Sequence, residues 1–273
     1  MSLVETATLS HGDLSVDVIP SRGLDLGTAR FAGERFSWES PIGHVPWQGD
    51  FNRSFGGGLM VTCGLRNVGA PSEGHPLHGW YSSLPARDVE ITATSASARI
   101  VDASIPGPTL ELSREIRLTD GAIRVTDVVR NAGTSVEPAP LLYHVNLLWD
   151  SVDIDAAEVV PRDENARNGD SRTLGELGPE RVYEHIGASR TEVGFGDIRV
   201  RVRSSLPRLW QWIEPSYGVL GIEPANCGAA RSARRLSHRA SRECGADCER
   251  GRAAVAQSRR RRRSRSSGAR DRG

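Results

Sequence analysis

Three titratable side chains stand out in this sequence as candidates for moving protons. They lie in three short segments, GHPLHGWY (74–81), APLLYHVNLLWD (139–150) and VLGIEPAN (219–226). Histidine titrates near neutral pH, and a positioned carboxyl group can accept or donate the matching proton. The candidates for acid–base chemistry are therefore His78, His144 and Glu223. By contrast, His75 precedes a proline and is read as an ordinary loop residue.

The setting of two of these side chains is unusual. If 139–150 is a strand, His144 and Asn146 project from the same face of an otherwise apolar segment. Burying them is costly unless they have partners. Glu223 follows an apolar run that ends at Pro224, which predicts either a surface ion pair or a functional site. The residues alone also allow His144 to be a core histidine with satisfied hydrogen bonds.

Short strands are the elements that must position these residues. The clearest is the pair of alternating runs in 109–133, which flank Asp120-Gly121, a strong hairpin signal. No segment keeps a sustained 3.6-residue apolar period, and 161–190 is polar and predicts a long surface connection. Many short strands with Gly and Pro between them are typical of an all-β sandwich or barrel. Further strand-like runs are 14–20, 28–38, 86–94, 197–204 and 218–224.

With these motifs in place, the chain resembles the aldose 1-epimerase or galactose mutarotase-like superfamily. Leu77-His-Gly-Trp80 resembles the His-Gly motif of that family, and Pro140-Leu-Leu-Tyr-His-Val-Asn-Leu147 resembles its strand with a histidine shortly before Asn-Leu. Gly221-Ile-Glu-Pro224 is similar to the late strand that carries the catalytic glutamate. The segments 54–69 and 210–212 are closest to an uncharacterised branch of the superfamily. The resemblance covers about 13–228.

The resemblance implies a large antiparallel β-sandwich, the galactose mutarotase-like supersandwich, over 1–228. It also implies an isomerase that opens a cyclic hemiacetal and closes it on the other face. That reaction needs one base at the anomeric hydroxyl and one acid at the ring oxygen. The resemblance makes Glu223 the base and His144 the acid. We expect the two to flank a hollow of monosaccharide size.

The same resemblance implies further contacts with a free sugar or sugar acid. His78 would donate a hydrogen bond to the ring oxygen or to a hydroxyl group. Arg53 would bind hydroxyl groups, and Asn146 and Trp212 complete the predicted substrate-binding residues. No organic cofactor is expected, and no metal, although a cupin-like metal site that includes His75 stays an alternative. A carbohydrate-binding sandwich without turnover is the main alternative function.

The charge distribution divides the chain at about residue 228. All 35 basic residues are arginine, and 15 of them lie in 229–273 against four of the 34 acids. That segment therefore carries +11 and the remainder carries −10. It contains no Phe, Trp, Tyr, Ile or Met, so we expect a disordered Arg-rich tail.

Two hypotheses explain this tail. It could be an arm that binds nucleic acid non-specifically through its arginines. We favour the second, that 229–273 is translated out of frame, because the resemblance stops at Cys227. The sandwich would then lack its last strands, and we expect exposed sheet edges and reduced stability.

Targeting signals are not evident. No run of 18 or more apolar residues predicts a transmembrane helix, and the N-terminus does not read as a signal peptide. We therefore expect a cytoplasmic protein with reduced cysteines and no membrane partner.

Overall fold

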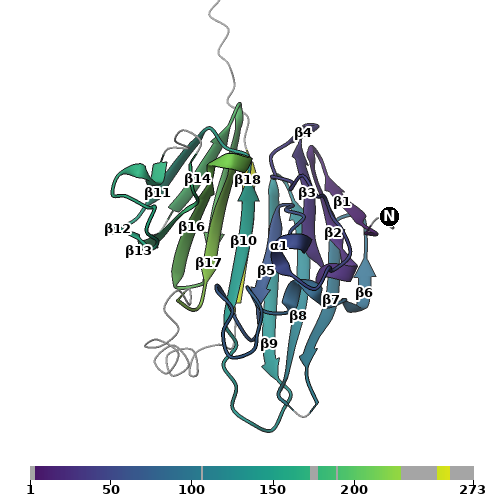
Figure 1. The fold of residues 1–273 in the computed structure, drawn as a ribbon. Helices are drawn as coiled ribbons and strands as arrows, with labels where there is room; N and C mark the ends of the chain where they lie inside the picture. Colours follow the sequence, from purple (N-terminus) through teal and green to yellow (C-terminus); the bar gives the residue numbers. More distant parts are fainter. Residues whose placement is uncertain (1–3, 106, 173–177, 189, 229–250, 259–273) are drawn as a thin grey trace, which may run out of the picture.

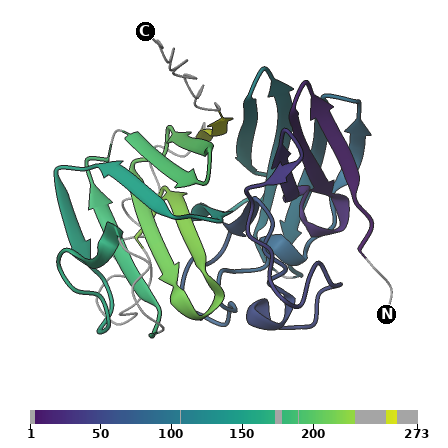
Figure 2. The same ribbon diagram turned by 90° about the horizontal axis from the view of Figure 1, so that it is seen from above.

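Two antiparallel sheets packed face to face form the molecule, which confirms the predicted β-sandwich (Figures 1 and 2). The computed structural model describes residues 4–105, 107–172, 178–188, 190–228 and 251–258. No helix among these residues is long and apolar enough to cross a membrane. The helical segments are α1 (Phe51–Ser54), η1 (Pro20–Arg22), η2 (Tyr81–Ser83), η3 (Asp170–Arg172) and η4 (Pro215–Tyr217).

The first sheet has the strand order β1-β2-β3-β5-β10-β17-β16-β13-β12, and β4 pairs with β3. Its central strands come from distant parts of the sequence, so the sheet assembles through long-range pairing. Its strands are β1 (Ala7–His11), β2 (Leu14–Ile19), β3 (Asp25–Phe31), β4 (Glu34–Arg35), β5 (Met60–Gly64), β10 (Leu141–Leu147), β12 (Glu158–Pro161), β13 (Arg181–Ile186), β16 (Arg208–Glu214) and β17 (Val219–Ala225).

The second sheet has the order β11-β14-β15-β18-β9-β8-β7-β6. Its β8–β9 hairpin turns at Asp120-Gly121, as predicted. Residues along β8 alternate between the core and the surface, because only one face of this sheet is covered. Its strands are β6 (Arg87–Ile91), β7 (Ser95–Ala103), β8 (Thr109–Thr119), β9 (Ala122–Asn131), β11 (Ser151–Asp155), β14 (Arg190–Phe195), β15 (Ile198–Ser204) and β18 (Gly251–Ser258).

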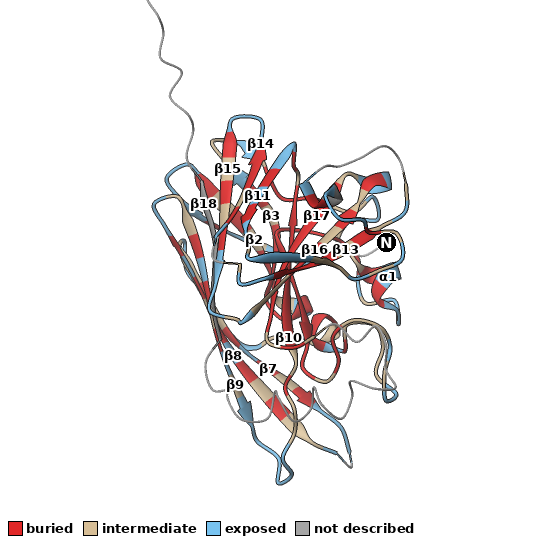
Figure 3. Cartoon of the chain, turned by 90° about the vertical axis from the view of Figure 1, so that its left-hand side faces the viewer, coloured by how far each residue is buried: buried red, intermediate tan, exposed pale blue. Residues whose placement is uncertain are grey.

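The central strands β5, β10 and β17 are buried along their whole length. One face of each packs against the second sheet, in the main hydrophobic core. The other face lies under a second, smaller cluster that includes Phe51 and Val68, from the segment 44–80, and Trp210. Figure 3 shows this contrast between the buried centre around β10 and the alternating β8–β9 hairpin. The outer face of the first sheet is therefore covered at its middle.

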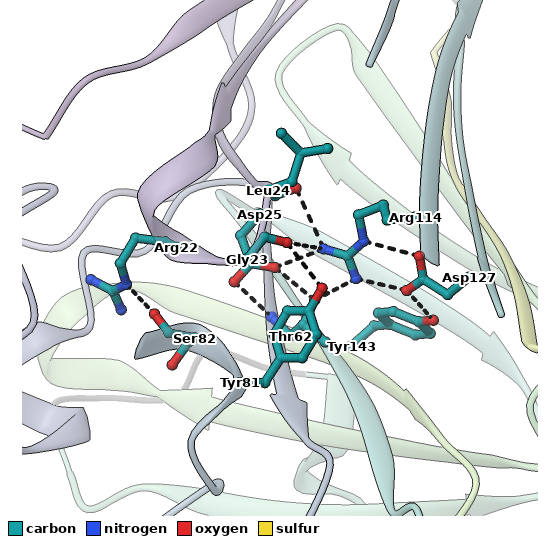
Figure 4. A network of polar contacts seen from close by, with 10 residues as sticks. All are labelled: Arg22, Gly23, Leu24, Asp25, Thr62, Tyr81, Ser82, Arg114, Asp127 and Tyr143. Atoms are coloured by element: carbon teal, nitrogen blue, oxygen red, sulfur yellow. Dashed lines mark hydrogen bonds and ion pairs between the residues drawn. The ribbon is translucent and has the colours of Figure 1, made fainter. Parts of the chain in front are cut away.

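A buried polar network joins the two sheets directly behind this middle region (Figure 4). Arg114 of β8 donates to Asp127 of β9 at 3.0 and 2.7 Å, and to Asp25 of β3 at 2.9 Å. Thr62 donates to Asp25 at 2.6 Å, and the Tyr143 hydroxyl donates to Asp127 at 2.7 Å. Because all five side chains are buried, the network fixes β3, β5 and β10 against the second sheet.

A second buried arginine holds the segment that covers the outer face. Arg22 donates to the backbone carbonyls of Val45 at 3.2 Å, Ser54 at 2.9 Å and Ser82. Its guanidinium also lies over the Trp47 ring at 5.8 Å. Both ends of the α1 region are therefore tied to the sandwich through one side chain.

The structure differs from the sequence-based expectation in two places. The polar stretch 161–190 is not a connection throughout, because β13 (Arg181–Ile186) pairs with β16 in the first sheet. Within the Arg-rich segment, only the backbone of 251–258 is described, and it forms β18 between β9 and β15. The remaining residues after 228 lie outside the described residues.

Candidate active site

Strand register brings His144 and Glu223 together on the outer face of the first sheet. β10 and β17 are antiparallel neighbours, with Val145 opposite Ile222. In that register His144 lies opposite Glu223, and both project away from the main core. The two residues that the sequence singled out as an acid–base pair are therefore neighbours on adjacent strands.

The two side chains touch directly. His144 Nε2 lies 3.1 Å from Glu223 Oε1, and the side chains are only 6% and 8% exposed. This differs from the expectation of a monosaccharide-sized hollow between them. Hollows of about 430 Å³ and 260 Å³ do occur among the described residues, but neither is lined by His144 or Glu223. In this structure the acid and the base are in contact.

Aromatic rings enclose the pair. The His144 ring centroid lies 5.2 Å from Phe55, 5.3 Å from Trp212 and 6.1 Å from His78. His78 in turn packs on Phe51 of α1 at 4.7 Å. The covering segment thus supplies two phenylalanines, and β16 supplies the tryptophan. Together they exclude water from the pair.

The backbone at His78 adopts a conformation that is rare for a non-glycine residue. Its φ is +61°, in the left-handed region, where side chains other than glycine are strained. Its Nδ1 accepts a hydrogen bond from the Gly69 backbone N–H at 3.4 Å, which places the proton of the neutral ring on Nε2. Burial lowers the pKa of His78 to about 4. At neutral pH His78 is therefore uncharged, and its Nε2–H is a hydrogen-bond donor.

Burial also sets the protonation of the pair. It raises the pKa of Glu223 to about 8, and the nearby Glu180 adds to that shift. It lowers the pKa of His144 to about 3, and the nearby His78 lowers it further. At neutral pH the neutral imidazole and the carboxyl group then share one titrating proton. This proton is on the carboxyl group, which donates it in a hydrogen bond to His144 Nε2. A buried pair that shares one proton can act as an acid and as a base at once.

Polar atoms at this place lack partners. His144 Nδ1, Asn146 Oδ1 and Trp210 Nε1 are buried without a hydrogen bond of ordinary geometry among the described residues. The Asn146 side chain nevertheless lies close enough to the His144 ring to raise its pKa. Orphaned buried polar atoms are uncommon in folded proteins and call for an explanation such as a ligand. The three atoms belong to residues on the same face of the sheet as Glu223. They are therefore available to bind hydroxyl groups.

Of the other predicted binding residues, Trp212 and Asn146 lie beside His144 and Arg53 does not. Trp212 borders His144, and its indole N–H donates to Glu180 at 3.0 Å. Asn146 is fully buried beside His144 and donates to the backbone carbonyl of Gly58 at 3.1 Å. Arg53 lies on α1 with an exposed side chain, and no contact within the described ranges joins it to the pair. The structure therefore brings together all the predicted residues except Arg53.

Sequence reasoning missed some residues of this site. Gly221 lies beneath the pair, where a Cβ would come 2.8 Å from Glu223 Oε1 and 3.0 Å from His144 Cε1. An isolated glycine in an apolar strand is a sign of close approach, so this residue could have been found. Phe55 and Glu180 had no such signal, because their contacts depend on the folded positions of loops.

A metal-dependent alternative finds no support in the side-chain geometry. Within the described ranges, no group of three or more His, Cys, Asp or Glu side chains is arranged to hold a metal ion. His75 lines the hollow of about 430 Å³, together with the rest of 71–76 and Trp80. Neither His144 nor Glu223 lines that hollow.

The chain is similar to a known sequence family and to several solved structures. The sequence profile of the family described as "Domain of unknown function (DUF4432)" matches residues 3–243. The last part of that match, 229–243, lies outside the described residues. No curated protein matches the sequence.

Several solved structures share the fold. A candidate aldose 1-epimerase from Klebsiella pneumoniae superposes with a TM-score of 0.72 at 20% identity, over 92% of this chain and 78% of that chain. One from Escherichia coli has a TM-score of 0.72 at 14% identity, over 94% and 99% of the chains. A galactose mutarotase-like protein from Lactobacillus casei has 0.68 at 13%, over 93% and 100%. At these identities the similarity establishes the fold alone, which is galactose mutarotase-like.

Proposed function

The chain belongs to the family described as domain of unknown function DUF4432 and has the galactose mutarotase-like fold, and on that premise we propose that it is an aldose 1-epimerase-like isomerase. Its substrate is a free sugar or sugar acid in the cyclic hemiacetal form. The observation that carries this proposal is the buried contact between His144 and Glu223, at 3.1 Å, on the outer face of the first sheet.

The proposed mechanism uses the one proton that the pair holds. Ring opening requires that one group take the proton of the anomeric hydroxyl while another gives a proton to the ring oxygen. In the resting pair Glu223 carries the proton, so in this state Glu223 is the acid and His144 is the base. Transfer of the proton across the contact gives the reverse roles, which are those that the family resemblance implies. Either state can open the ring, and closure on the other face returns the proton.

Substrate must separate the pair for this to happen. The sugar would replace the direct hydrogen bond with one contact to each group, and the orphaned atoms of His144 and Asn146 would bind its hydroxyl groups. The Trp212 and Phe55 rings offer apolar faces to its C–H groups. The binding step is therefore expected to shift the His144 ring signals in an NMR titration.

The test is magnetisation-transfer NMR between the α and β anomers of D-galactose or D-glucose. Replacing Glu223 with Gln removes the titrating proton, and we expect exchange to fall by roughly 100-fold or more. The matched control is Glu192→Gln, a carboxylate of the second sheet. We also expect exchange to decline above about pH 8, because the pair then loses its proton.

The result separates the two functions considered. If Glu223→Gln exchanges anomers as fast as the wild type, the enzymatic proposal is wrong. If the wild type binds the sugar without accelerating exchange, the domain is a carbohydrate-binding sandwich without turnover. Binding of nucleic acid through the Arg-rich tail stays a prediction, because most of 229–273 lies outside the described residues.

A further inference from the structure

Two arginines share one carboxylate on the outer face of the first sheet, beyond the candidate pair. Arg208 Nη1 donates to Glu184 Oε1 at 2.7 Å, and Arg162 donates to Glu184 Oε2. The Arg162 guanidinium also lies 5.9 Å from the centroid of the Trp210 ring. These three charged residues, which we name the arginine pair site, are not explained by the reaction proposed above.

The register of the sheet places this site in line with the acid–base pair. Glu223 lies opposite Trp210, and Trp210 lies opposite Glu184. The row therefore runs from His144 through Glu223 and Trp210 to Glu184. Two strand spacings separate Glu223 from Glu184, which is about 10 Å. That is the scale of one sugar ring with a substituent.

Charge favours an anion at this site. A single arginine would balance Glu184, so the second arginine leaves an excess of one positive charge. Glu184 is only 5% exposed, while the arginine side chains are 40% and 39% exposed. Each guanidinium has five N–H donors, and Glu184 is the only side-chain hydrogen-bond acceptor that contacts either one in the described part of the chain. Further donors therefore remain for a ligand.

Neighbouring groups agree with this assignment. Between Glu223 and the arginines lies the Trp210 indole N–H, which is buried and has no partner among the described residues. Two nearby carboxylates already accept hydrogen bonds, Asp163 from backbone N–H groups and Glu180 from Trp212, which engages their oxygens and leaves their negative charges in place. Within the row, the group between the reacting pair and the arginines, Trp210, is therefore a hydrogen-bond donor.

From these positions we infer that the arginine pair site binds an anionic group on the far end of the substrate. The substrate would then be an acidic sugar, with a carboxylate or phosphate remote from its anomeric centre. Planar guanidinium groups bind both kinds of oxyanion through paired hydrogen bonds. This inference rests on the proposed function, because it identifies the far end of the substrate through the position of the acid–base pair.

The experiment compares D-glucose, D-glucuronate and glucose 6-phosphate by calorimetric titration and by anomer exchange. We expect the preferred acidic sugar to bind about tenfold or more tightly than glucose, since charge-assisted hydrogen bonds exceed neutral ones. Which of the two acids binds more tightly distinguishes a carboxylate from a phosphate. In Arg162→Gln and Arg208→Gln the preference over glucose should fall towards one.

A matched control is Arg201→Gln. Arg201 is 41% exposed and pairs with Glu192, but it lies on the second sheet. It should keep the full preference. Because one arginine still balances Glu184, each single variant is expected to fold. The double variant Arg208→Gln/Glu184→Gln restores the excess of one positive charge on Arg162 and should regain part of the preference.

The outcomes are separable from those of the proposed function. If glucose and both acids bind and exchange equally, and the arginine variants match the wild type, the inference is wrong while the enzyme proposal stands. If the acids bind through the arginines but no anomer exchange is accelerated, the site stands and the enzyme proposal fails. Equal loss of preference in Arg201→Gln would show general charge attraction and would overturn the site.

Discussion

At the scale of single residues, burial decides what His144 and Glu223 can do. A histidine and a carboxylate in water would both be charged near pH 5.5, and their contact would be an ordinary ion pair. Here the lack of water disfavours both charges, so the proton moves to the carboxyl group. The same burial makes the pair a group that both donates and accepts a proton at neutral pH.

This protonation has a consequence for stability. Glu223 binds its proton more tightly in the folded protein than in the unfolded one. Its contribution to the free energy of unfolding is therefore full below its ordinary pKa of 4.5 and is lost as pH rises through about 8. His78 and His144 bind their protons less tightly in the folded protein. Their contribution to the free energy of unfolding is therefore full above pH 6.5, and it is lost as pH falls through about 4 for His78 and about 3 for His144. Together these three groups favour a stability maximum at about pH 6.5.

Melting temperatures from pH 5 to 9 test this. We expect the wild type to lose stability between pH 5 and 8 relative to Glu223→Gln, by on the order of 1 kcal/mol per pH unit, and to lose little more above pH 8. Glu192→Gln should follow the wild type. Parallel curves for wild type and Glu223→Gln would mean that Glu223 is ionised at pH 7.

Gly221 provides a test of the contact itself. In Gly221→Ala the added Cβ would come 2.8 Å from Glu223 Oε1, so the carboxyl group must move away from His144. Because the displaced atom ends a flexible side chain, we expect a small change in melting temperature, below about 1 kcal/mol in unfolding free energy. Anomer exchange should nevertheless fall by at least tenfold. Full exchange activity in a folded Gly221→Ala would show that the contact is not needed.

At the scale of elements, the buried Arg114 network positions the strands that carry the site. Thr62 and Tyr143 face the network from β5 and β10, and each is adjacent in sequence to a residue on the site face. Arg114 is fully buried between Asp25 and Asp127, the two carboxylates that pair with it in the described part of the chain. The network therefore fixes the position of β10 through Tyr143 on its inner face, and with it the position of His144 on its outer face.

Removing the arginine should therefore be costly. We expect Arg114→Met to lower the free energy of unfolding by roughly 3–5 kcal/mol, because two buried carboxylates lose their partner. Arg117→Met, on the same strand with its side chain 64% exposed, should change it by less than about 0.5 kcal/mol. Urea unfolding measures both. Equal midpoints for the two variants would contradict the assignment of Arg114 as a core ion pair.

At the scale of the whole molecule, the second sheet is continuous only through β18. Its backbone pairs with β9 on one side and β15 on the other, and it comes from the Arg-rich segment after residue 228. A chain without this strand would present the unpaired edges of β9 and β15. Such edges promote association with other chains.

Truncation tests this role. We expect a chain that ends at Gly228 to show lower soluble yield, a lower melting temperature and larger species in size-exclusion chromatography. A chain that ends at Ser258 keeps β18 and should behave as the full chain does. If the chain ending at Gly228 is monomeric and melts at the same temperature, β18 does not complete the sheet.

Local sequence patterns determined a large part of this protein. The alternation around Asp120-Gly121 predicted the β8–β9 hairpin, and the apolar runs before Glu223 and around His144 predicted their strands. These features depend on residues within one or two strands, where side-chain periodicity and turn geometry are encoded directly. The polar segment around Glu184 was misread for the same reason, because β13 is stabilised by its neighbours and not by its own apolar pattern.

Only the tertiary structure decided which residues meet. The pairing of β10 with β17 places His144 against Glu223, and pairing across β16 and β13 aligns Glu184 with them. The direct contact in place of a hollow, and the covering rings such as Phe55, depend on how the loop over the sheet packs. Register between distant strands is set by the packing of the whole sheet, and no short stretch of sequence contains it.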